Sequence, residues 1–146
     1  MKVLIECIEK TKEKYELAPD GVSFTVDRML ERPWEANYGF VPKTLQADGD
    51  GLDAYVLGKT SQGVVENCLP LCLIYTMDNG QVDNKLVCAT VTAKCFSFKH
   101  KIKRIVHFIN KYKKGSQAVL VSWKADNIRY ELAKCKALYK LFKEAV

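Results

Sequence analysis

Hydrophobic and polar residues alternate along much of the first two thirds of the chain. Within residues 22–28, Val22, Phe24 and Val26 alternate with polar residues, and this period of two predicts a half-buried strand. Further β-rich runs lie at 3–7, 15–17, 53–57, 69–77 and 85–91. Glycine-containing turns separate the later runs. This part of the chain is therefore predicted to be mostly β.

The spacing of hydrophobic residues becomes helical from Ile102 onwards. An amphipathic helix is predicted there, and Lys114-Gly115 supplies a stop. Its hydrophobic residues are Ile102, Ile105, Val106, Ile109 and Tyr112. A strand is predicted at 118–123, after which Asp126 can cap a second helix. The apolar stripe of that helix, expected to pack in the core, is Ile128, Leu132, Cys135, Tyr139 and Phe142.

These elements predict a mainly β protein with flanking helices, in the α+β class. Short strands at close intervals, followed by helices, favour a small, closed or nearly closed β-barrel with two helices packed against it. The 146 residues, 48% of them hydrophobic, suffice for one core, so residues 1–146 are expected to form a single domain. No apolar run is long enough to span a bilayer, and Glu6 interrupts the hydrophobic start. We therefore expect a soluble, cytoplasmic protein with no secretory signal and no membrane contact.

The six cysteines are scattered without a CxxC pair, and four of them lie in apolar runs, where a thiol packs like a small hydrophobic side chain. They are Cys7, Cys68, Cys72, Cys88, Cys95 and Cys135. Buried free thiols in a reducing compartment are expected rather than disulfides or a zinc site. His100 and His107 have no cysteine at finger-like spacing.

The net charge of +6 is distributed unevenly along the chain. Residues 1–93 hold nine Lys/Arg against fourteen Asp/Glu, a balance of −5, whereas residues 94–146 hold fourteen against three, a balance of +11. An acidic half and a basic half together suit a polyanionic substrate carried by metal ions, and a basic half also suits nucleic acid. Both interpretations remain open on charge alone.

The segment from Asp48 to Asp53 places three carboxylates within six residues, with two glycines between them. Asp and Gly are common turn residues, so this segment alone fits a plain solvated turn. Crowded acids also need a positive charge such as Mg²⁺ or Ca²⁺ to stay ionised together. An EF-hand is excluded, because Leu52, Asp53 and Lys59 occupy positions that need a ligand, a glycine and a glutamate.

Other short motifs accompany this turn in a fixed order along the chain. They are Ile5-Glu6, Lys14-Tyr15-Glu16, Asp27-Arg28, Asn37-Tyr38-Gly39, the turn itself, Met77 to Lys85, and His107-Phe108 with Tyr112-Lys113. Each is weak alone, since Lys14 and Glu16 suit a cross-strand charge pair, Asn37 to Phe40 indicate an aromatic-glycine turn, and Tyr112 suits a core position. Their succession resembles that of the soluble family I inorganic pyrophosphatases across nearly the whole chain.

The resemblance implies a five-stranded OB-like β-barrel with a multi-metal site at its mouth, which hydrolyses pyrophosphate to two orthophosphates. Asp50 would be the general base that readies a metal-activated water. Mg²⁺, with Mn²⁺ as a possible substitute, would be held by Asp48, Asp53, Asp78, Asp83, Glu6 and Glu16, with Asp53 bridging two metals. The substrate-binding residues would be Lys14, Arg28, Tyr38, Lys85, Tyr112 and Lys113, with Lys85 supporting either the acidic site or the phosphate.

This chemistry explains the residue types. Two metal ions about 3.5 to 4 Å apart can share a water and lower its pKa from about 15.7 toward about 7, and cations absorb the charge of the leaving phosphate. Arginine offers a bidentate fork to phosphate, whereas lysines act as point charges.

The chain departs from the family pattern at a few positions, and an alternative function competes with hydrolysis. Gly51 replaces a proline of the signature, which loosens the turn and is expected to lower the affinity for the first metal. Asn79 stands where the family usually has an acid. Because relatives form dimers or hexamers, a homo-oligomer is expected. The alternative is a basic OB-like nucleic-acid-binding module in which Phe96 and Phe98 stack bases beside Lys99-His100-Lys101, but it leaves the ordered acids unexplained.

Overall fold

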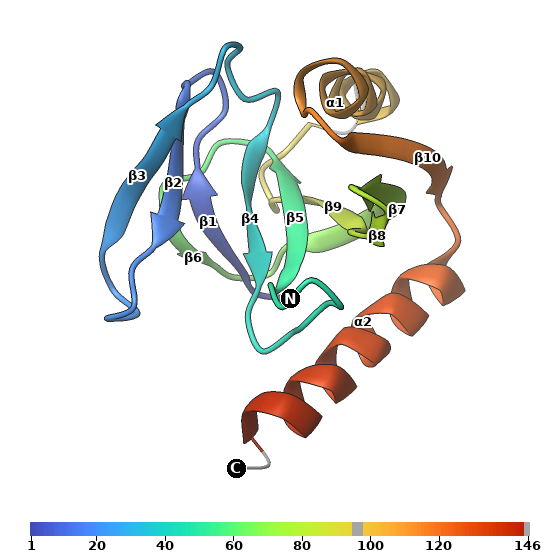
Figure 1. The fold of residues 1–146 in the computed structure, drawn as a ribbon. Helices are drawn as coiled ribbons and strands as arrows, with labels where there is room; N and C mark the ends of the chain where they lie inside the picture. Colours follow the sequence, from blue (N-terminus) through green and yellow to red (C-terminus); the bar gives the residue numbers. More distant parts are fainter. Residues whose placement is uncertain (95–97, 145–146) are drawn as a thin grey trace.

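An eight-stranded sheet that curls around the core forms the centre of the protein in the computed structural model, which describes residues 1–94 and 98–144 (Figure 1). The strand order is β10-β7-β9-β5-β4-β1-β6, and β8 pairs with β7. These strands are β1 (Val3–Cys7), β4 (Asn37–Val41), β5 (Leu52–Leu57), β6 (Gly63–Val65), β7 (Leu69–Asp78), β8 (Gln81–Val82), β9 (Lys85–Ala89) and β10 (Ser116–Ser122). The prediction of a mainly β protein with flanking helices is confirmed. The sheet has more strands than the five expected, and β10 and β6 remain as unpaired ends within the described chain.

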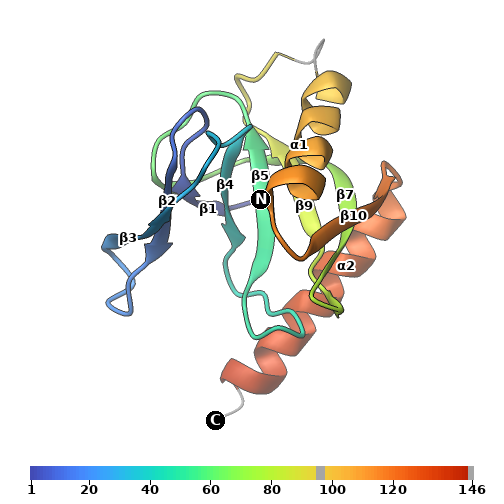
Figure 2. The same cartoon turned by 45° about the horizontal axis from the view of Figure 1, so that its top comes forward.

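The helices cover the sheet from two sides, and each belongs to its own hydrophobic cluster (Figure 2). Helix α1 (Phe98–Tyr112) contributes Ile105, Phe108 and Ile109 to one cluster. Helix α2 (Ala125–Tyr139) contributes Ile128 and Cys135 to the other. A short π-helical turn, η2 (Lys140–Glu144), follows α2. No helix in the described ranges is long and apolar enough to cross a membrane.

The parallel pair β5 and β9 lies at the centre of the sheet, between these two clusters. All five residues of β9 are buried, and so are five of the six in β5. Parallel strands covered on both faces read as continuous hydrophobic runs rather than alternating ones. The exceptions on these strands are Asp53 and Lys85, which face each other in the register. The sequence therefore places its charged residues at the starts of the two most buried strands.

Strands β2 (Glu13–Leu17) and β3 (Phe24–Met29) form a separate two-stranded sheet. A strand is present there as β3, beginning at Phe24 and not at Val22, but the predicted half-buried character is wrong, since Val26 is 51% exposed and five of the six residues are exposed. Residues 25–29 of β3 are all exposed, so no second layer of the described chain covers this strand. Alternation alone does not reveal whether a second layer is present.

Strand β4 occupies the segment Asn37–Val41, which the sequence had suggested as an aromatic-glycine turn. Gly39 lies where β1 passes close by, and a Cβ there would stand 1.8 Å from the backbone oxygen of Leu4. The glycine thus serves close strand packing and not a turn. Asn37 donates to the carbonyls of Val56 (3.0 Å) and Gly58 (2.7 Å), which holds β4 against β5.

Two details of α2 differ from the prediction. Lys124 occupies the N-cap position without a side-chain cap, and Asp126 pairs instead with Arg129 on the first turn. The predicted apolar stripe is buried at Ile128 and Cys135, but Phe142 beyond the helix is 59% exposed. The stripe therefore packs against the core only in its first part.

The prediction of buried free thiols is confirmed for the cysteines in the described ranges. Cys7, Cys68, Cys72, Cys88 and Cys135 are all buried and free. Cys95 lies outside the described residues.

Candidate active site

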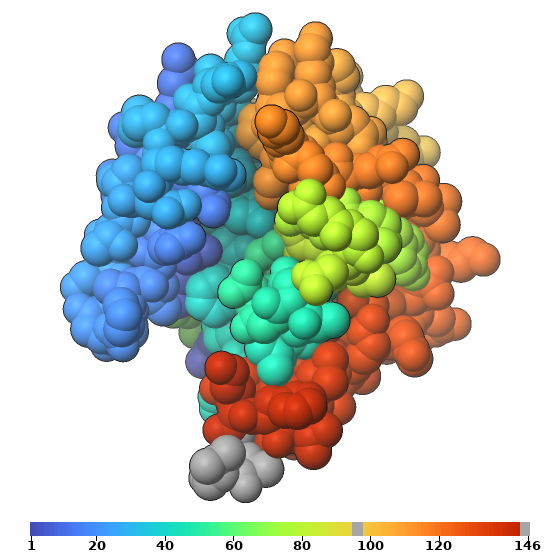
Figure 3. Space-filling model, viewed as in Figure 1, coloured from blue at the N-terminus to red at the C-terminus, as the bar shows by residue number. Residues whose placement is uncertain are grey.

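A cleft of about 510 Å³ opens where the β2–β3 hairpin faces the sheet. Figure 3 shows this face hollowed between the blue hairpin and the yellow-green turn that precedes β9, with the teal aspartate turn below. The predicted site residues that line the cleft are Glu6, Lys14, Glu16, Arg28, Tyr38, Asp48, Asp50, Asp53, Asp78, Asp83, Lys85 and Lys113. The fold thus brings together residues that are spread over more than a hundred positions of the chain.

The inner wall of the cleft is built on the start of β5 and β9. Asp53 pairs with Lys85 in the parallel register, and Asp83 precedes Lys85 by two residues. The Lys85 ammonium donates to Asp83 Oδ2 at 2.8 Å, to Asp53 Oδ2, and to the Tyr38 hydroxyl at 3.3 Å. The Lys85 side chain is only 1% exposed. One buried cation therefore ties together the carboxylates of Asp53 and Asp83.

The two carboxylates of this wall differ in their electrostatics. Burial raises the pKa of Asp53 above its usual value, although Lys85 opposes the rise. For Asp83, burial acts in the same direction, but the ammonium of Lys85 outweighs it and the pKa is lowered. The pKa of Lys85 is raised, because these two anions more than offset its desolvation. The wall thus favours a cation close to Asp53, where the lysine alone leaves excess negative charge.

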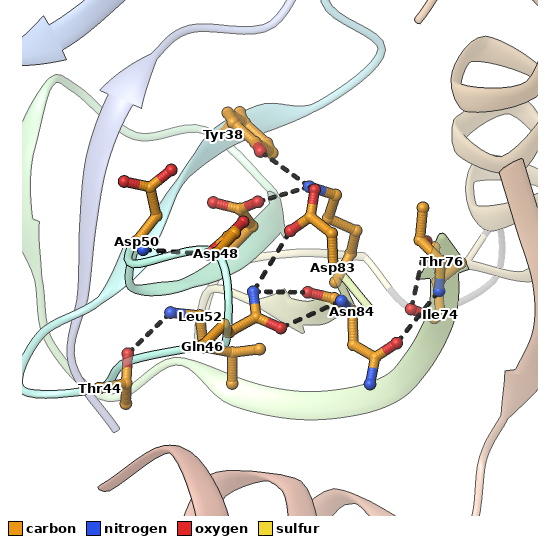
Figure 4. A network of polar contacts seen from close by, with 12 residues as sticks. Tyr38, Thr44, Gln46, Asp48, Asp50, Leu52, Ile74, Thr76, Asp83 and Asn84 are labelled. Carbon is orange, nitrogen blue, oxygen red and sulfur yellow. Dashed lines mark hydrogen bonds and ion pairs between the residues drawn. The ribbon is translucent and has the colours of Figure 1, made fainter. Parts of the chain in front are cut away.

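The aspartate turn forms the floor of the cleft and presents its acids to solvent. Asp50 donates its backbone N–H to Asp48 Oδ1 at 2.9 Å, and its carbonyl accepts the N–H of Gln46 at 2.7 Å. Gly49 has a φ of +91°, which a side chain would disfavour. Figure 4 shows Asp48 and Asp50 on this loop beside Asp83. Both side chains are exposed, as groups that exchange protons or bind ions require.

The side chains that line the cleft carry an excess of negative charge, which favours the binding of metal ions. The lining has seven carboxylates, including all three acids of the turn, and only four Lys or Arg side chains. Within the described residues no three acidic, histidine or cysteine side chains already stand as a closed metal-ligand group. Burial also raises the pKa of Asp48 and of Glu6, so these acids lack full compensation. An all-carboxylate donor set of this kind fits Mg²⁺, which commonly takes a few carboxylates and keeps several waters.

The hairpin forms the opposite wall and supplies cations. Lys14 and Arg28 stand directly opposite each other on β2 and β3, an arrangement that is destabilising unless anions lie nearby. In this structure Lys14 Nζ lies 3.3 Å from Asp27 and 3.6 Å from Glu16. Glu6 of β1 accepts the Leu17 N–H at 2.9 Å and so connects the hairpin to the sheet.

The end of α1 closes the cleft with Lys113, while Tyr112 lies outside it. Tyr112 lines a smaller adjoining cavity of about 40 Å³ together with Lys14, Arg28 and Lys113. The Lys113 ammonium stands 5.1 Å from the centre of the Tyr38 ring, and burial lowers its pKa to about 8. Arg32, a residue that the sequence did not single out, lies 5.4 Å from the Tyr112 ring centre.

Two further residues missed by the sequence analysis adjoin the metal-site candidates. Gln46 donates to Asp83 Oδ1 at 3.3 Å, and Asn84 donates its N–H to the Gln46 side chain at 3.1 Å (Figure 4). Gln46 belongs to none of the motifs, and Asn84 lies within the Met77 to Lys85 motif but had no role assigned to it, while the bond between the two spans 38 residues. No local signal could have identified them.

The surface proposed for stacking bases receives little support. Phe98 is partly buried, because it packs against the hydrophobic cluster that contains α1. Phe96 lies outside the described residues.

Comparisons with known proteins agree with the geometry. The sequence model of the family described as inorganic pyrophosphatase matches residues 3–140. An inorganic pyrophosphatase of Methanosarcina acetivorans is 33% identical, over 83% of this chain and 80% of the relative. Inorganic pyrophosphatase 2 of Pseudomonas syringae pv. tomato is 34% identical, over 90% of this chain and 83% of that protein.

Solved structures carry the same fold. The inorganic pyrophosphatase of Helicobacter pylori superposes with a TM-score of 0.81 at 29% identity, covering 96% of this chain and 93% of its own. The enzyme from Neisseria gonorrhoeae gives a TM-score of 0.84 at 24% identity, covering 96% and 91%, and supports the fold alone. With a family match over most of its length, this chain belongs to the inorganic pyrophosphatase family.

Proposed function

We propose that the cleft hydrolyses inorganic pyrophosphate to two orthophosphates. The observation that carries this proposal is the division of the cleft into two walls. Carboxylates concentrate on the sheet and the aspartate turn, and Lys14 and Arg28 face them from the hairpin. A compact polyanion with bound divalent cations is complementary to both walls, since the cations can bind the acids and the phosphates can bind the lysine and arginine.

The metal ions are proposed to be Mg²⁺, which Mn²⁺ can replace. Asp48, Asp53 and Asp83 would hold the first ion, Asp53 would also contribute to a second, and Asp78 and Asp83 would hold a further ion together with the substrate. Glu6 and Glu16 complete the acidic rim, partly through water. Bound metal supplies charge neutralisation of the phosphate oxygens and lowers the pKa of a water molecule.

Asp50 is proposed to act as the general base. Its side chain is exposed at the floor of the cleft, between the acidic wall and the hairpin. The backbone bonds of Asp50 to Asp48 and Gln46 fix its position, while its carboxylate makes no recorded contact with another described side chain. A carboxylate that is held by its backbone but free at its oxygens can accept a proton from water.

The remaining residues grip the substrate. Arg28 offers a bidentate fork to one phosphate, and Lys14 and Lys113 act as point charges. Tyr38 donates its hydroxyl from the inner wall, and Tyr112 donates from the adjoining cavity. Of the two roles open to Lys85, support of the acidic site is favoured, because its ammonium is buried between Asp53 and Asp83.

We also propose that residues 1–146 act as a single domain in a cytoplasmic homo-oligomer. Five free thiols are typical of a reducing compartment. Val119, Leu120, Trp123 and Tyr130 are exposed on β10 and at the adjoining start of α2, and they offer an apolar surface for a second copy. Light scattering of the purified protein and fractionation of cells measure these two properties.

The function is tested by phosphate release from pyrophosphate. We expect release that depends on Mg²⁺, stops with a chelator and returns when the ion is restored. Mn²⁺ should replace Mg²⁺ in part. A protein that is folded by circular dichroism but releases no phosphate at any Mg²⁺ concentration would refute the proposal.

A further inference from the structure

We propose that Gln46, Asn84 and Glu131 form a positioning relay that fixes the Asp83 carboxylate and connects α2 to the metal site. The inference rests on the proposed function for the role of Asp83 as a metal ligand. Gln46 and Glu131 lie outside the sequence motifs, Asn84 lies within the Met77 to Lys85 motif without an assigned role, and none of the three is expected to touch the substrate. The relay consists of hydrogen bonds among buried groups, each between segments that are distant in sequence.

The first step of the relay fixes both oxygens of Asp83. Gln46 Nε2 donates to Oδ1 at 3.3 Å, and Lys85 Nζ donates to Oδ2 at 2.8 Å. Asp83 is 6% exposed and Gln46 5%. With a donor on each oxygen, the carboxylate has one preferred orientation. Groups that hydrogen-bond to metal ligands commonly orient them in this way.

Gln46 also connects Asp83 to the proposed base. Its backbone N–H donates to the Asp50 carbonyl at 2.7 Å, and its carbonyl accepts the Gly49 N–H at 3.1 Å. The backbone of Gln46 therefore closes the aspartate turn, while its side chain holds Asp83 (Figure 4). One residue thus sets the position of the base relative to a metal ligand on another strand.

The second step fixes the orientation of the Gln46 amide. The Asn84 N–H donates to Gln46 Oε1 at 3.1 Å, which requires the amide nitrogen to face Asp83. Gln46 Nε2 also lies 3.4 Å from the Asn84 carbonyl. The Asn84 side chain is held in turn, because its Oδ1 accepts the Thr76 N–H at 3.1 Å. An amide with both ends assigned in this way cannot rotate without breaking several buried bonds.

The third step brings in α2. Asn84 Nδ2 donates to Glu131 Oε1 at 3.1 Å, and Lys134 lies 3.1 Å from Glu131 Oε2. Glu131 is 3% exposed although it is ionisable, and a buried carboxylate is costly unless its oxygens are bonded. A second link runs in parallel, since the Leu45 N–H donates to the Cys135 carbonyl of α2 at 2.9 Å. The helix thus contacts the segment before the aspartate turn and the residue after Asp83.

The test measures metal binding directly, with Mn²⁺ as the probe and without substrate. Free Mn²⁺ is followed by its electron paramagnetic resonance signal, well below the unfolding midpoint of each variant. Q46M keeps the side-chain length but removes the donor. We expect its Kd for Mn²⁺ to rise about tenfold, which is the lower end of the effect seen when a group that hydrogen-bonds to a metal ligand is removed.

The helix end of the relay is tested by a pair of variants at Glu131. E131L removes the acceptor for Asn84 and should raise the Kd by a smaller factor than Q46M. E131Q keeps an oxygen at that position and should return the Kd close to that of the parent. If Q46M fails to fold, the two Glu131 variants still test whether the relay affects metal binding.

A matched control separates the relay from general loosening of α2. Asn127 Nδ2 donates to Ser122 Oγ at 2.8 Å and fastens the start of α2 to β10, away from Asp83. N127A should lower the unfolding midpoint and leave the Kd unchanged. In phosphate release, high Mg²⁺ should restore the rate of Q46M, which a lost catalytic group would not allow.

The relay is overturned if Q46M binds Mn²⁺ like the parent, or if E131L and N127A change the Kd equally. If the parent binds Mn²⁺ and the variants rank as expected while pyrophosphate is not hydrolysed, the proposed function fails and the relay stands.

Discussion

The two walls of the cleft are built in different ways. The acidic wall stands on β5 and β9, the central parallel pair, where nearly every residue is buried and Lys85 joins Asp53 to Asp83. The basic wall stands on a separate two-stranded hairpin, whose β3 is mostly exposed. Metal ligands need fixed geometry, whereas long cationic side chains can follow a substrate as it binds and leaves. The cleft therefore places its rigid metal-ligand candidates on the core and its adaptable cationic side chains on an attached hairpin.

The largest effect is expected at the rigid wall. D53N keeps the shape of the side chain but removes charge from the proposed bridging ligand, so we expect kcat to fall about a thousandfold, or about 4 kcal/mol of transition-state stabilisation. Steady-state phosphate release at several Mg²⁺ concentrations measures it. D20N, at the exposed hairpin tip, serves as the control and should match the parent. Equal rates for D53N and the parent would contradict the role of the wall.

The second largest difference between the sheet and the hairpin is expected in the free energy of unfolding. In G39A the added methyl meets the Leu4 carbonyl of the neighbouring strand, so we expect a loss of about 3 kcal/mol, at the upper end of overpacking effects. G21A lies on the hairpin, where a Cβ meets nothing within 4 Å but φ is +75°, and should cost about 1 kcal/mol. Urea unfolding of both variants measures the difference. An equal cost at the two glycines would mean that the sheet is no more tightly packed than the hairpin.

The basic wall should affect substrate affinity more than turnover. R28A removes a charged hydrogen-bond donor from an exposed position, so we expect KM to rise about thirtyfold, equivalent to about 2 kcal/mol. The unfolding midpoint should not change. Kinetics of R28A beside K12A, an exposed lysine that does not line the cleft, provide the check. A fall in kcat with KM unchanged would show that Arg28 acts in the chemical step and not in substrate binding.

The smallest effect concerns the aspartate turn between β4 and β5, which forms the floor of the cleft. Gly51 does not have a positive φ, and its N–H makes no recorded bond within the described chain, so a proline can be accommodated there. Its Cβ would stand 3.0 Å from the half-exposed Phe40 ring, which must shift slightly. We expect G51P to bind Mn²⁺ about twofold more tightly. A stiffer turn has less conformational freedom to lose on binding, which lowers the free-energy cost by about 0.5 kcal/mol. Weaker binding would show that the glycine is required as such.

Much of the architecture could be predicted from the pattern of hydrophobic residues. Most of the central strands and α1 follow from period and turn residues, because burial on the sheet or helix imposes those periods. Strand β4 was missed because Gly39 indicates a turn in isolation, whereas its reason is the approach of Leu4 from another strand. The exposure of β3 was missed because alternation does not say whether a second layer exists.

The candidate site divides in the same way. The acids and cations of the ordered motifs could be found, because the succession of these motifs resembles that of a known family. Gln46 and Glu131 could not, since their bonds to Asn84 span 38 and 47 residues and depend on how α2 docks. Tyr112 could be placed on its helix but not in the cleft, as its ring lines the adjoining cavity.

Phosphate release by D50N beside the parent protein, each with saturating Mg²⁺, together with a Mn²⁺ titration of both, tests whether Asp50 is the general base of a metal-dependent hydrolysis. We expect Mg²⁺-dependent hydrolysis of pyrophosphate by the parent. For D50N we expect a rate at least about a hundredfold lower, because a positioned base contributes about 10² to 10⁴ in rate. The Mn²⁺ Kd should be nearly unchanged, because Asp50 is assigned to the proton and not to the metal. A D50N protein that hydrolyses pyrophosphate at the parental rate, or that loses activity only because it no longer binds Mn²⁺, would contradict the role of Asp50 as the base.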